Sequence, residues 1–266
     1  MILDELAAGT RARIEGQKKE IPLEAMREQA ETMAKEKESG FPFEQALRQK
    51  GLSFICEVKK ASPSKGVIAA DFPYLQIAKE YEGAGAAALS VLTEPDRFLG
   101  QDRYLREIAE AVSIPVLRKD FTVDEYMIYQ AKVLGASAVL LICSILSREQ
   151  LKEYQELADR LGLSALVEAH TEEEIRQALE AGARIVGVNN RNLKDFTVDV
   201  MNSVRLRQLV PKDIVFVSES GIRTPEDTRR LYENGTDAVL IGETFMRSPN
   251  KKAMLDSLRA GGRVSR

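Results

Sequence analysis

The feature that most constrains the fold of this chain is a unit that recurs along it: an amphipathic helical stretch, a glycine, and then a short apolar run. Gly135 precedes the apolar run 137–142, and Gly235 precedes the run 237–242. A glycine directly after a helix accepts the left-handed conformation that ends the helix. The runs are continuously apolar and rich in β-branched residues, which is typical of parallel strands covered on both faces. The sequence therefore predicts alternating helices and strands.

The unit recurs often enough to close a barrel. We predict eight strands, at residues 54–59, 87–92, 115–119, 137–142, 165–168, 184–189, 214–218 and 237–242. The helices that follow them are expected at roughly 73–84, 101–112, 123–134, 147–161, 171–181, 199–210, 224–234 and 248–260. Eight such units indicate a single (β/α)8 TIM barrel, an α/β fold of typically ~250 residues, and this chain has 266. A doubly wound open sheet is the alternative, but no GxGxxG motif opens the first unit.

The segment before the first strand has a different character. Residues 1–50 are charged and amphipathic and have the pattern of helices. We interpret them as an N-terminal helical extension packed on the barrel, which either closes its floor or flanks its mouth. Residues 51–266 are expected to form the barrel, and the whole chain one domain overall.

Composition excludes several classes of function. The net charge is −3, so no basic field indicates a nucleic acid or a membrane as partner. The N-terminal sequence has no secretion-signal pattern, and no apolar run approaches the ~18 residues of a membrane span, so we expect a cytoplasmic protein. Cys56 and Cys143 lie in apolar runs and are expected to be buried free thiols. His170 is the only histidine, so no multi-histidine metal site is expected.

Charged side chains gather where the predicted strands end, which is where barrels of this type place their chemistry. Glu57 and Lys59 are two residues apart and share the inner face of the first strand, whereas Cys56 faces outward, which weakens a nucleophilic role for it. Lys119 and Glu168 end two further strands. Buried charges are costly unless they pair or work, and four that converge in one mouth indicate catalysis. A buried lysine that acts as a general acid near neutral pH needs a lowered pKa.

A second group of residues predicts a phosphate site. Ser220 and Gly221 follow the seventh predicted strand, and Gly242 and Glu243 follow the eighth. Loops at these two positions commonly bind phosphate through backbone N–H groups, and glycine lets the backbone approach the ligand. A negatively charged Glu243 side chain would repel phosphate unless it points away.

Four more residues near the strand ends are assigned lesser roles. We interpret His170 as a loop residue without a role, and Cys143 as a packing residue. Arg118 is expected to point outward, by parity with Lys119. Phe98, in the loop after the second strand, is either an aromatic wall for a substrate or a packing residue of the loop.

Seven segments, taken in order, resemble the indole-3-glycerol-phosphate synthase family, which closes the indole ring in tryptophan biosynthesis. They are EVKKASPSKG at 57–66, LTEPD at 92–96, LRKDF at 117–121, LVE at 166–168, GVNNRNL at 187–193, SESGI at 218–222 and IGE at 241–243. The resemblance implies a (β/α)8 barrel with an extra N-terminal helical segment. The implied substrate is 1-(2-carboxyphenylamino)-1-deoxyribulose 5-phosphate, and the implied products are indole-3-glycerol phosphate, CO2 and water. No cofactor and no metal are implied.

The resemblance also implies roles for individual residues. Lys119 looks like the general acid for the ketone oxygen, and Lys59 would bind the substrate carboxylate, with Ser62 nearby. Glu168 would stabilise positive charge on the anilino nitrogen or exchange the proton of the dehydration step. Glu57 and Asn189 would orient these groups and the sugar hydroxyls, and Arg191 would contact polar groups of the substrate or hold Glu168. The phosphate site would be formed by Ser220, Gly221, Gly242 and Glu243, the last two mostly through backbone N–H groups, with Glu219 as support beneath it.

Two other readings are kept beside this one. Another phosphosugar barrel enzyme, such as phosphoribosylanthranilate isomerase, uses a cysteine base at its first strand, but Cys56 is one residue out of phase. A non-catalytic barrel that only binds a phosphorylated ligand would not need Glu57 and Glu168. We expect a small phosphorylated substrate as the partner, and a monomer or weak homodimer in solution.

Overall fold

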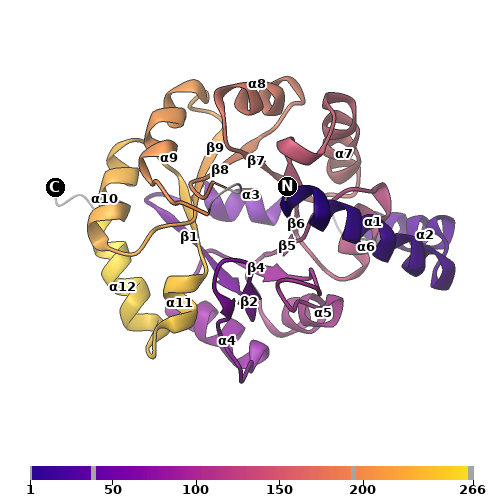
Figure 1. The fold of residues 1–266 in the computed structure, drawn as a ribbon, viewed down its shortest axis with the longest axis horizontal. Helices are drawn as coiled ribbons and strands as arrows, with labels where there is room; N and C mark the ends of the chain where they lie inside the picture. The colour runs from indigo at the N-terminus through magenta and orange to yellow at the C-terminus, as the bar shows by residue number, and fades with distance from the viewer. Residues whose placement is uncertain (1, 37–39, 193–195, 263–266) are drawn as a thin grey trace.

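Eight parallel strands close into a barrel in the computed structural model, which describes residues 2–36, 40–192 and 196–262 (Figure 1). The strands are β1 (Ser53–Val58), β4 (Ala88–Leu92), β5 (Val116–Lys119), β6 (Ala138–Ile142), β7 (Ser164–Ala169), β8 (Ile185–Asn189), β9 (Val215–Glu219) and β10 (Ala238–Ile241). Each end lies within one residue of its predicted position, which confirms the TIM barrel. The ring is closed by parallel pairing of β1 with β10, in which Ile55 lies opposite Leu240.

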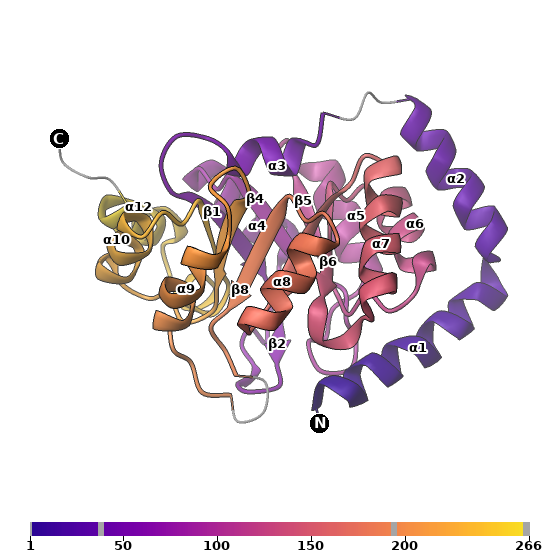
Figure 2. The ribbon, with the colours of Figure 1, turned by 90° about the horizontal axis from the view of Figure 1, so that it is seen from above.

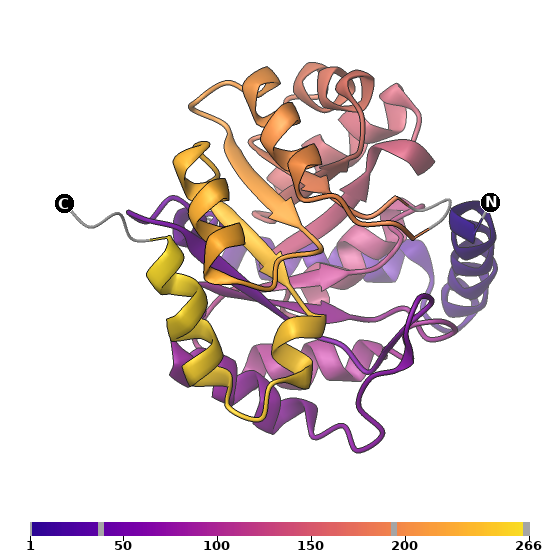
Figure 3. The same ribbon diagram turned by 60° about the vertical axis from the view of Figure 1, so that its left-hand side comes forward.

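Helices cover the outside of the barrel. They are α4 (Tyr74–Ala84), α5 (Asp102–Ala111), α6 (Glu125–Val133), α7 (Arg148–Arg160), α8 (Glu172–Glu180), α9 (Met201–Leu206), α10 (Pro225–Glu233), α11 (Glu243–Arg247) and α12 (Lys251–Gly261), with 3₁₀ turns η1 (Cys143–Ile145) and η2 (Arg207–Leu209). The last of them, α12, lies between α10 and α4, so the end of the ring packs against its beginning (Figure 3).

Alternation along the strands separates two apolar layers. Ile55, Leu117 and Leu166 belong to the cluster that fills the inside of the barrel. Cys56 and Cys143 belong to the layer between strands and helices, where both are buried. The predicted outward direction of Cys56 is therefore confirmed, and Cys143 is a packing residue, as predicted.

The N-terminal segment forms three helices that reach both ends of the barrel. They are α1 (Ile2–Glu20), α2 (Leu23–Glu36) and α3 (Pro42–Leu47), and α1 and α2 run along one side of the barrel (Figure 2). Phe43 of α3 is fully buried in the inner apolar cluster and closes the floor. The N-terminal end of α1 lies at the mouth, where Leu3 lines the central pocket. The N-terminal segment therefore closes the floor with α3 and flanks the mouth with α1.

Two predicted helices differ from the observed ones. The helix expected at 199–210 is α-helical only over α9 and ends as the 3₁₀ turn η2, because Pro211 disfavours helical backbone in the residue before it. The helix expected at 248–260 is observed as α12, which begins three residues later, at Lys251, while α11 before it was not predicted. Ser248 is extended before Pro249, and Asn250 begins α12 by accepting a hydrogen bond from Ala253 N.

The loop after β1 holds a feature that was not predicted. A small hairpin of β2 (Ala61–Ser62) and β3 (Gly66–Val67) forms in the loop after β1. Leu193 of the sequence motif and residues 263–266 of the predicted barrel lie outside the described residues. No helix within the described ranges has the length and apolar character needed to cross a membrane.

Candidate active site

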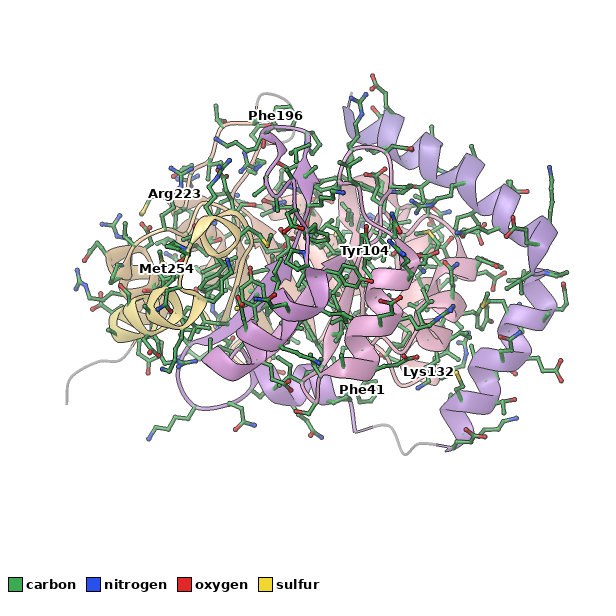
Figure 4. The ribbon with its side chains drawn as sticks, turned by 90° about the horizontal axis from the view of Figure 1, so that it is seen from below. Phe41, Tyr104, Lys132, Phe196, Arg223 and Met254 are labelled. Atoms are coloured by element: carbon green, nitrogen blue, oxygen red, sulfur yellow. The ribbon has the colours of Figure 1, made fainter. Side chains whose placement is uncertain are left out.

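The pocket of interest lies at the carboxyl ends of the barrel strands. In Figure 4 Phe196 lies at this end and Phe41, which precedes α3, at the opposite end. All the site residues predicted from sequence line this one pocket; they are Glu57, Lys59, Ser62, Lys119, Glu168, Asn189, Arg191, Glu219, Ser220, Gly221, Gly242 and Glu243. Their placement follows from the parallel sheet, which brings the ends of all strands to one rim.

Lys119, the last residue of β5, lies between two carboxylates. Its Nζ is 2.9 Å from Glu168 Oε2 and 3.3 Å from Glu219 Oε2. Burial alone would lower the pKa of Lys119, but the negative charges of Glu168, Glu219 and Glu57 outweigh burial and raise it above its ordinary value. The expectation of a lowered pKa for Lys119 is therefore wrong. The lysine is held protonated.

Glu168 carries the negative charge of this cluster. Burial alone would raise its pKa, but Lys119, His170 and a hydrogen bond from Asn189 lower it to about 2. Asn189 Nδ2 donates to Glu168 Oε1 at 3.3 Å. Glu168 is therefore an ionised base beside a protonated lysine.

Glu219 is the second carboxylate and has the opposite tendency. Its burial is the main cause, and together with the nearby charge of Glu168 it raises the pKa of Glu219 to about 7 although Lys119 opposes it. Its Oε1 atom is buried and has no hydrogen-bond partner among the described residues. Two carboxylates that share one ammonium group thus have different affinities for a proton.

Two glycines make room for these charges. A Cβ atom on Gly187 would overlap Glu219 Oε1 and meet Leu166 at 3.0 Å. A Cβ atom on Gly242 would overlap Glu57 Oε1 and come within 2.9 Å of Lys59 Nζ. Glu57 and Lys59 form an ion pair with each other. Glu57 lies within β1, near its end, whereas Lys59 lies just past its end, because the strand stops at Val58 and not at Lys59 as expected. Bare backbone therefore lies directly beneath the buried charges.

The predicted phosphate edge has an unusual backbone. Ser220 and Gly221 follow β9 with φ angles of 70° and 83°, in the left-handed region. Val198 packs where a Gly221 side chain would lie, so this position has no space for a Cβ atom. The Glu243 carboxylate accepts a hydrogen bond from Arg247 Nε at 3.1 Å and lies 3.9 Å from Lys65 Nζ. Two cations thus offset the charge that would repel a phosphate.

Arg191 bonds within its own loop. Its backbone N donates to Asn189 Oδ1 at 3.0 Å, and its Nη1 donates to Phe196 O at 3.2 Å. The sequence left open whether Arg191 contacts substrate or holds Glu168. In the structure it is Asn189, and not Arg191, that bonds Glu168 from this strand end.

Sequence reasoning underrated His170. Its Nε2 lies 3.6 Å from Glu168 Oε1, and its Nδ1 lies 3.3 Å from Glu174 Oε2. Burial alone would lower the pKa of His170, but these carboxylates raise it. The signal was present in the sequence, because residues two apart at a strand end share a face.

The apolar wall of the pocket was only partly foreseen. Phe98 lines the pocket, and its ring centroid is 6.2 Å from that of Phe121. Leu3 and Leu6 of α1 complete this side and were not predicted, although their spacing of three residues on a helix is a signal. Arg118 points outward as predicted and bonds Thr93 Oγ1, Asp102 Oδ1 and Met127 O at 3.0 to 3.2 Å.

The pocket combines two ion clusters, an apolar wall and a glycine-containing rim. One cluster is the Glu57–Lys59 pair, and the other is Lys119 with Glu168 and Glu219. This arrangement can bind a molecule that has a flat apolar part and an anionic end, and it can move protons between them. Over residues 2–36, 40–192 and 196–262 no group of three His, Cys, Asp or Glu side chains is placed to hold a metal ion.

Comparisons with known proteins agree on one family. The family model described as indole-3-glycerol phosphate synthase matches residues 3–258. A protein of that name from Ruminiclostridium cellulolyticum is 58% identical over 259 residues, covering 97% of this chain and 99% of the relative. One from Lachnoclostridium phytofermentans is 52% identical over 269 residues, covering 98% and 99%. Among solved structures, 3-hexulose-6-phosphate synthase from Salmonella typhimurium has a TM-score of 0.65 at 12% identity, covering 79% of this chain and 98% of that one, a likeness of fold alone.

Proposed function

The chain belongs to the indole-3-glycerol phosphate synthase family, and from this premise we propose that it converts 1-(2-carboxyphenylamino)-1-deoxyribulose 5-phosphate into indole-3-glycerol phosphate, CO2 and water. As a member of that family it is a carboxy-lyase of tryptophan biosynthesis. The observation that carries the proposed mechanism is Lys119, held protonated between Glu168 and Glu219 at the bottom of the pocket.

Ring closure needs an acid at the ketone. The ring carbon that bears the carboxylate attacks the ketone carbon, and the ketone oxygen takes up a proton as its double bond to carbon becomes single. Lys119 donates this proton. A positioned general acid contributes about 10² to 10⁴ in rate. When Glu168 takes up a proton, one of the charges that raises the pKa of Lys119 disappears, so Lys119 becomes a stronger acid as the reaction proceeds.

Loss of CO2 follows from charge placement. Lys59 binds the substrate carboxylate, with Ser62 beside it, and Glu57 holds Lys59 through their ion pair. The carbon–carbon bond to the carboxylate breaks, CO2 leaves, and the electron pair restores the aromatic ring. The apolar wall with Phe98 and Phe121 packs against the phenyl ring.

Dehydration needs a base and an acid together. Glu168 accepts the proton lost next to the anilino nitrogen, and the hydroxyl leaves as water after protonation by a lysine. Because a carboxylate leaves as CO2, one proton is taken from solvent in each turnover. Asn189 orients Glu168, and Arg191 orders the loop beside the sugar hydroxyls.

The phosphate is placed at the rim after β9 and β10. Backbone N–H groups at Ser220, Gly221, Gly242 and Glu243 bind it, and the left-handed backbone of the first two residues aims the chain toward the pocket. Glu219 supports this edge from below while it shares Lys119 with Glu168.

The decisive experiment supplies the carboxyphenylamino-deoxyribulose phosphate and records indole fluorescence. The intact protein should produce an indole signal, and Lys119→Ala and Glu168→Gln should lose most of it. Lys152→Ala, an exposed lysine on α7, is the matched control and should keep the full rate. No indole signal from the intact protein would overturn the proposed function, and a full rate in Lys119→Ala would overturn the role of the general acid.

A further inference from the structure

Asn190, the residue directly after β8, is a buried polar side chain to which the proposed chemistry assigns nothing. It is 4% exposed. Its Nδ2 donates to Ser218 Oγ and to Ser220 O, each at 3.0 Å. Its Oδ1 accepts from Ser203 N at 3.0 Å and from Ser203 Oγ at 2.8 Å. Both donors and both acceptor sites of the amide are therefore used.

The amide is part of a closed ring of hydrogen bonds. Ser218 Oγ donates to Ser203 Oγ at 2.7 Å, so Asn190, Ser203 and Ser218 bond one another in turn. Ser203 N is one of the donors in the first turn of α9, which has no partner within its own helix. A single side chain thus joins the start of α9 to the end of β9.

The backbone of Asn190 adds to this connection. Its N–H donates to Glu219 O at 2.9 Å, and its carbonyl accepts from Asp199 N at 3.0 Å. Asn190 therefore donates hydrogen bonds to three consecutive residues: to Oγ of Ser218 and to the carbonyl oxygens of Glu219 and Ser220.

The segment that Asn190 holds has an unfavourable backbone. Ser220 has a φ of 70°, and a residue with a Cβ atom loses about 1 kcal/mol or more in the left-handed region. Such a conformation persists only where the surroundings fix it. The hydrogen bond from Asn190 Nδ2 to Ser220 O is the contact that fixes this turn from the side of β8.

We propose that Asn190 is a positioning residue that holds the turn of Ser220 and Gly221 in its phosphate-binding shape and so sets the affinity for the phosphate end of the substrate. The inference rests on the proposed function only in assigning phosphate to this turn. It gives Asn190 no contact with the reacting atoms, so the effect acts on binding and not on the chemical step.

The Asn190→Asp variant tests this most sharply. It keeps the size of the side chain and an acceptor for Ser203, but it removes both Nδ2 donors and places a carboxylate against Ser220 O. The matched control is Asn234→Asp. Asn234 ends α10, and its Nδ2 donates to Val204 O of α9 at 3.1 Å, so the control removes a comparable bond to the same helix outside the pocket.

Two readouts separate positioning from general loss of structure. The first is the dissociation constant of inorganic phosphate, measured by titration calorimetry, and the second is KM against kcat for the phosphorylated substrate. Asn190→Asp should weaken phosphate binding and raise KM by about tenfold, which corresponds to one or two lost hydrogen bonds, with kcat nearly unchanged. Asn234→Asp should change neither value, although its melting temperature falls. A folded Asn190→Asp with the phosphate affinity of the intact protein would overturn the inference.

A second variant decides the matter if Asn190→Asp does not fold. Ser203→Ala keeps the amide donors but frees one side of the Asn190 acceptor, and it should weaken phosphate binding about threefold. An unchanged phosphate affinity in Ser203→Ala would then overturn the inference, as would an intact protein that does not bind phosphate. Phosphate binding needs no turnover: if Asn190→Asp loses it while the intact protein binds phosphate but makes no indole, only the proposed function fails.

Discussion

Lys119 Nζ lies 2.9 Å from Glu168 Oε2, so the acid and the base of the proposed reaction are hydrogen-bonded to each other before substrate binds. The pair is neutral as a unit, which lowers the cost of burying both charges. A proton taken up by Glu168 can return directly to Lys119 after each turnover. The same contact makes the two side chains interdependent, because a change in the charge of one alters the affinity of the other for a proton.

Lys119→Arg keeps a positive charge between Glu168 and Glu219 but replaces the ammonium with a guanidinium that does not release its proton in proteins. We expect turnover to fall by about 10² to 10⁴, the usual contribution of a general acid. The melting temperature should fall less than in Lys119→Ala, which leaves two buried carboxylates without their cation. Single-turnover kinetics and calorimetry check both values. Substantial turnover in Lys119→Arg would show that charge alone is sufficient at this position.

Glu219→Gln is expected to change how stability depends on pH. The pKa of Glu219 is raised in the folded protein from 4.5 to about 7, so the folded state keeps a proton that the unfolded state has released. The stability from this group is complete below pH 4.5 and is lost as the pH rises through 7. Glutamine resembles the protonated form at every pH. The variant should therefore gain stability over the intact protein between pH 5 and pH 8, by an amount of the order of 3 kcal/mol.

Urea unfolding at several pH values measures this difference. Asp227→Asn, in the first turn of α10, where the half-buried carboxylate accepts hydrogen bonds from Arg223 N and Thr224 N, is a control that should show no such gain over the same range. A constant difference between Glu219→Gln and the intact protein from pH 5 to pH 8 would contradict the raised pKa.

Gly187→Ala and Gly242→Ala test whether the charge cluster needs bare backbone. An added Cβ atom would overlap Glu219 Oε1 in the first variant and Glu57 Oε1 in the second. Overpacking in a close-packed interior lowers the free energy of unfolding by about 1 to 3 kcal/mol. Turnover should fall as well, because the carboxylates are displaced from their positions in the pocket. Gly83→Ala is the matched control: it lies within α4, no atom lies within 4 Å of its added Cβ, and it should gain about 0.5 to 1 kcal/mol. Unchanged turnover in Gly187→Ala would show that Glu219 can move without consequence.

Arg13→Ala tests how firmly α1 is fixed to the barrel. Arg13 Nη2 lies 2.8 Å from Asp120 Oδ2, and the Asp120 side chain is fully buried next to Lys119 in sequence. Loss of a hydrogen bond to a charged, buried group should cost about 1.5 to 3 kcal/mol of unfolding free energy. Arg27→Ala breaks an ion pair of α2 with Glu125 in which both side chains are exposed, and it should cost less than about 0.5 kcal/mol. Equal losses in the two variants would contradict the role of burial.

The sequence predicted the barrel and the rim residues because both follow from local rules. The apolar runs near Gly135 and Gly235 specify strands, and parallel pairing brings strand ends such as Lys119 and Glu168 to the same rim without further information. The start of α12 was also specified locally, by Pro249 and the N-cap Asn250, although the prediction began this helix at 248 and missed the short α11 before it.

What could not be predicted depends on distances between segments remote in the chain. The raised pKa of Lys119 results from three carboxylates contributed by three other strands, whereas burial alone suggested the opposite direction. The contribution of Leu3 to the pocket depends on the path of α1 along the barrel. The ring of Asn190, Ser203 and Ser218 likewise joins two strand ends and a helix, and no spacing in the sequence reveals it.

The pairing of β1 with β10 has a consequence for the order in which this protein matures. Glu57 and Lys59 stand at the end of the first barrel strand to be synthesised, but the glycine beneath them, Gly242, follows the last. On the ribosome the earlier strands can pair with their neighbours, whereas this seam forms only after β10 has emerged. Contacts so distant in sequence form slowly, because loop-closure entropy opposes them. The seam that completes the ring also brings the backbone of Gly242 against the Glu57–Lys59 ion pair, so a nascent chain acquires the complete pocket only at the end of its folding.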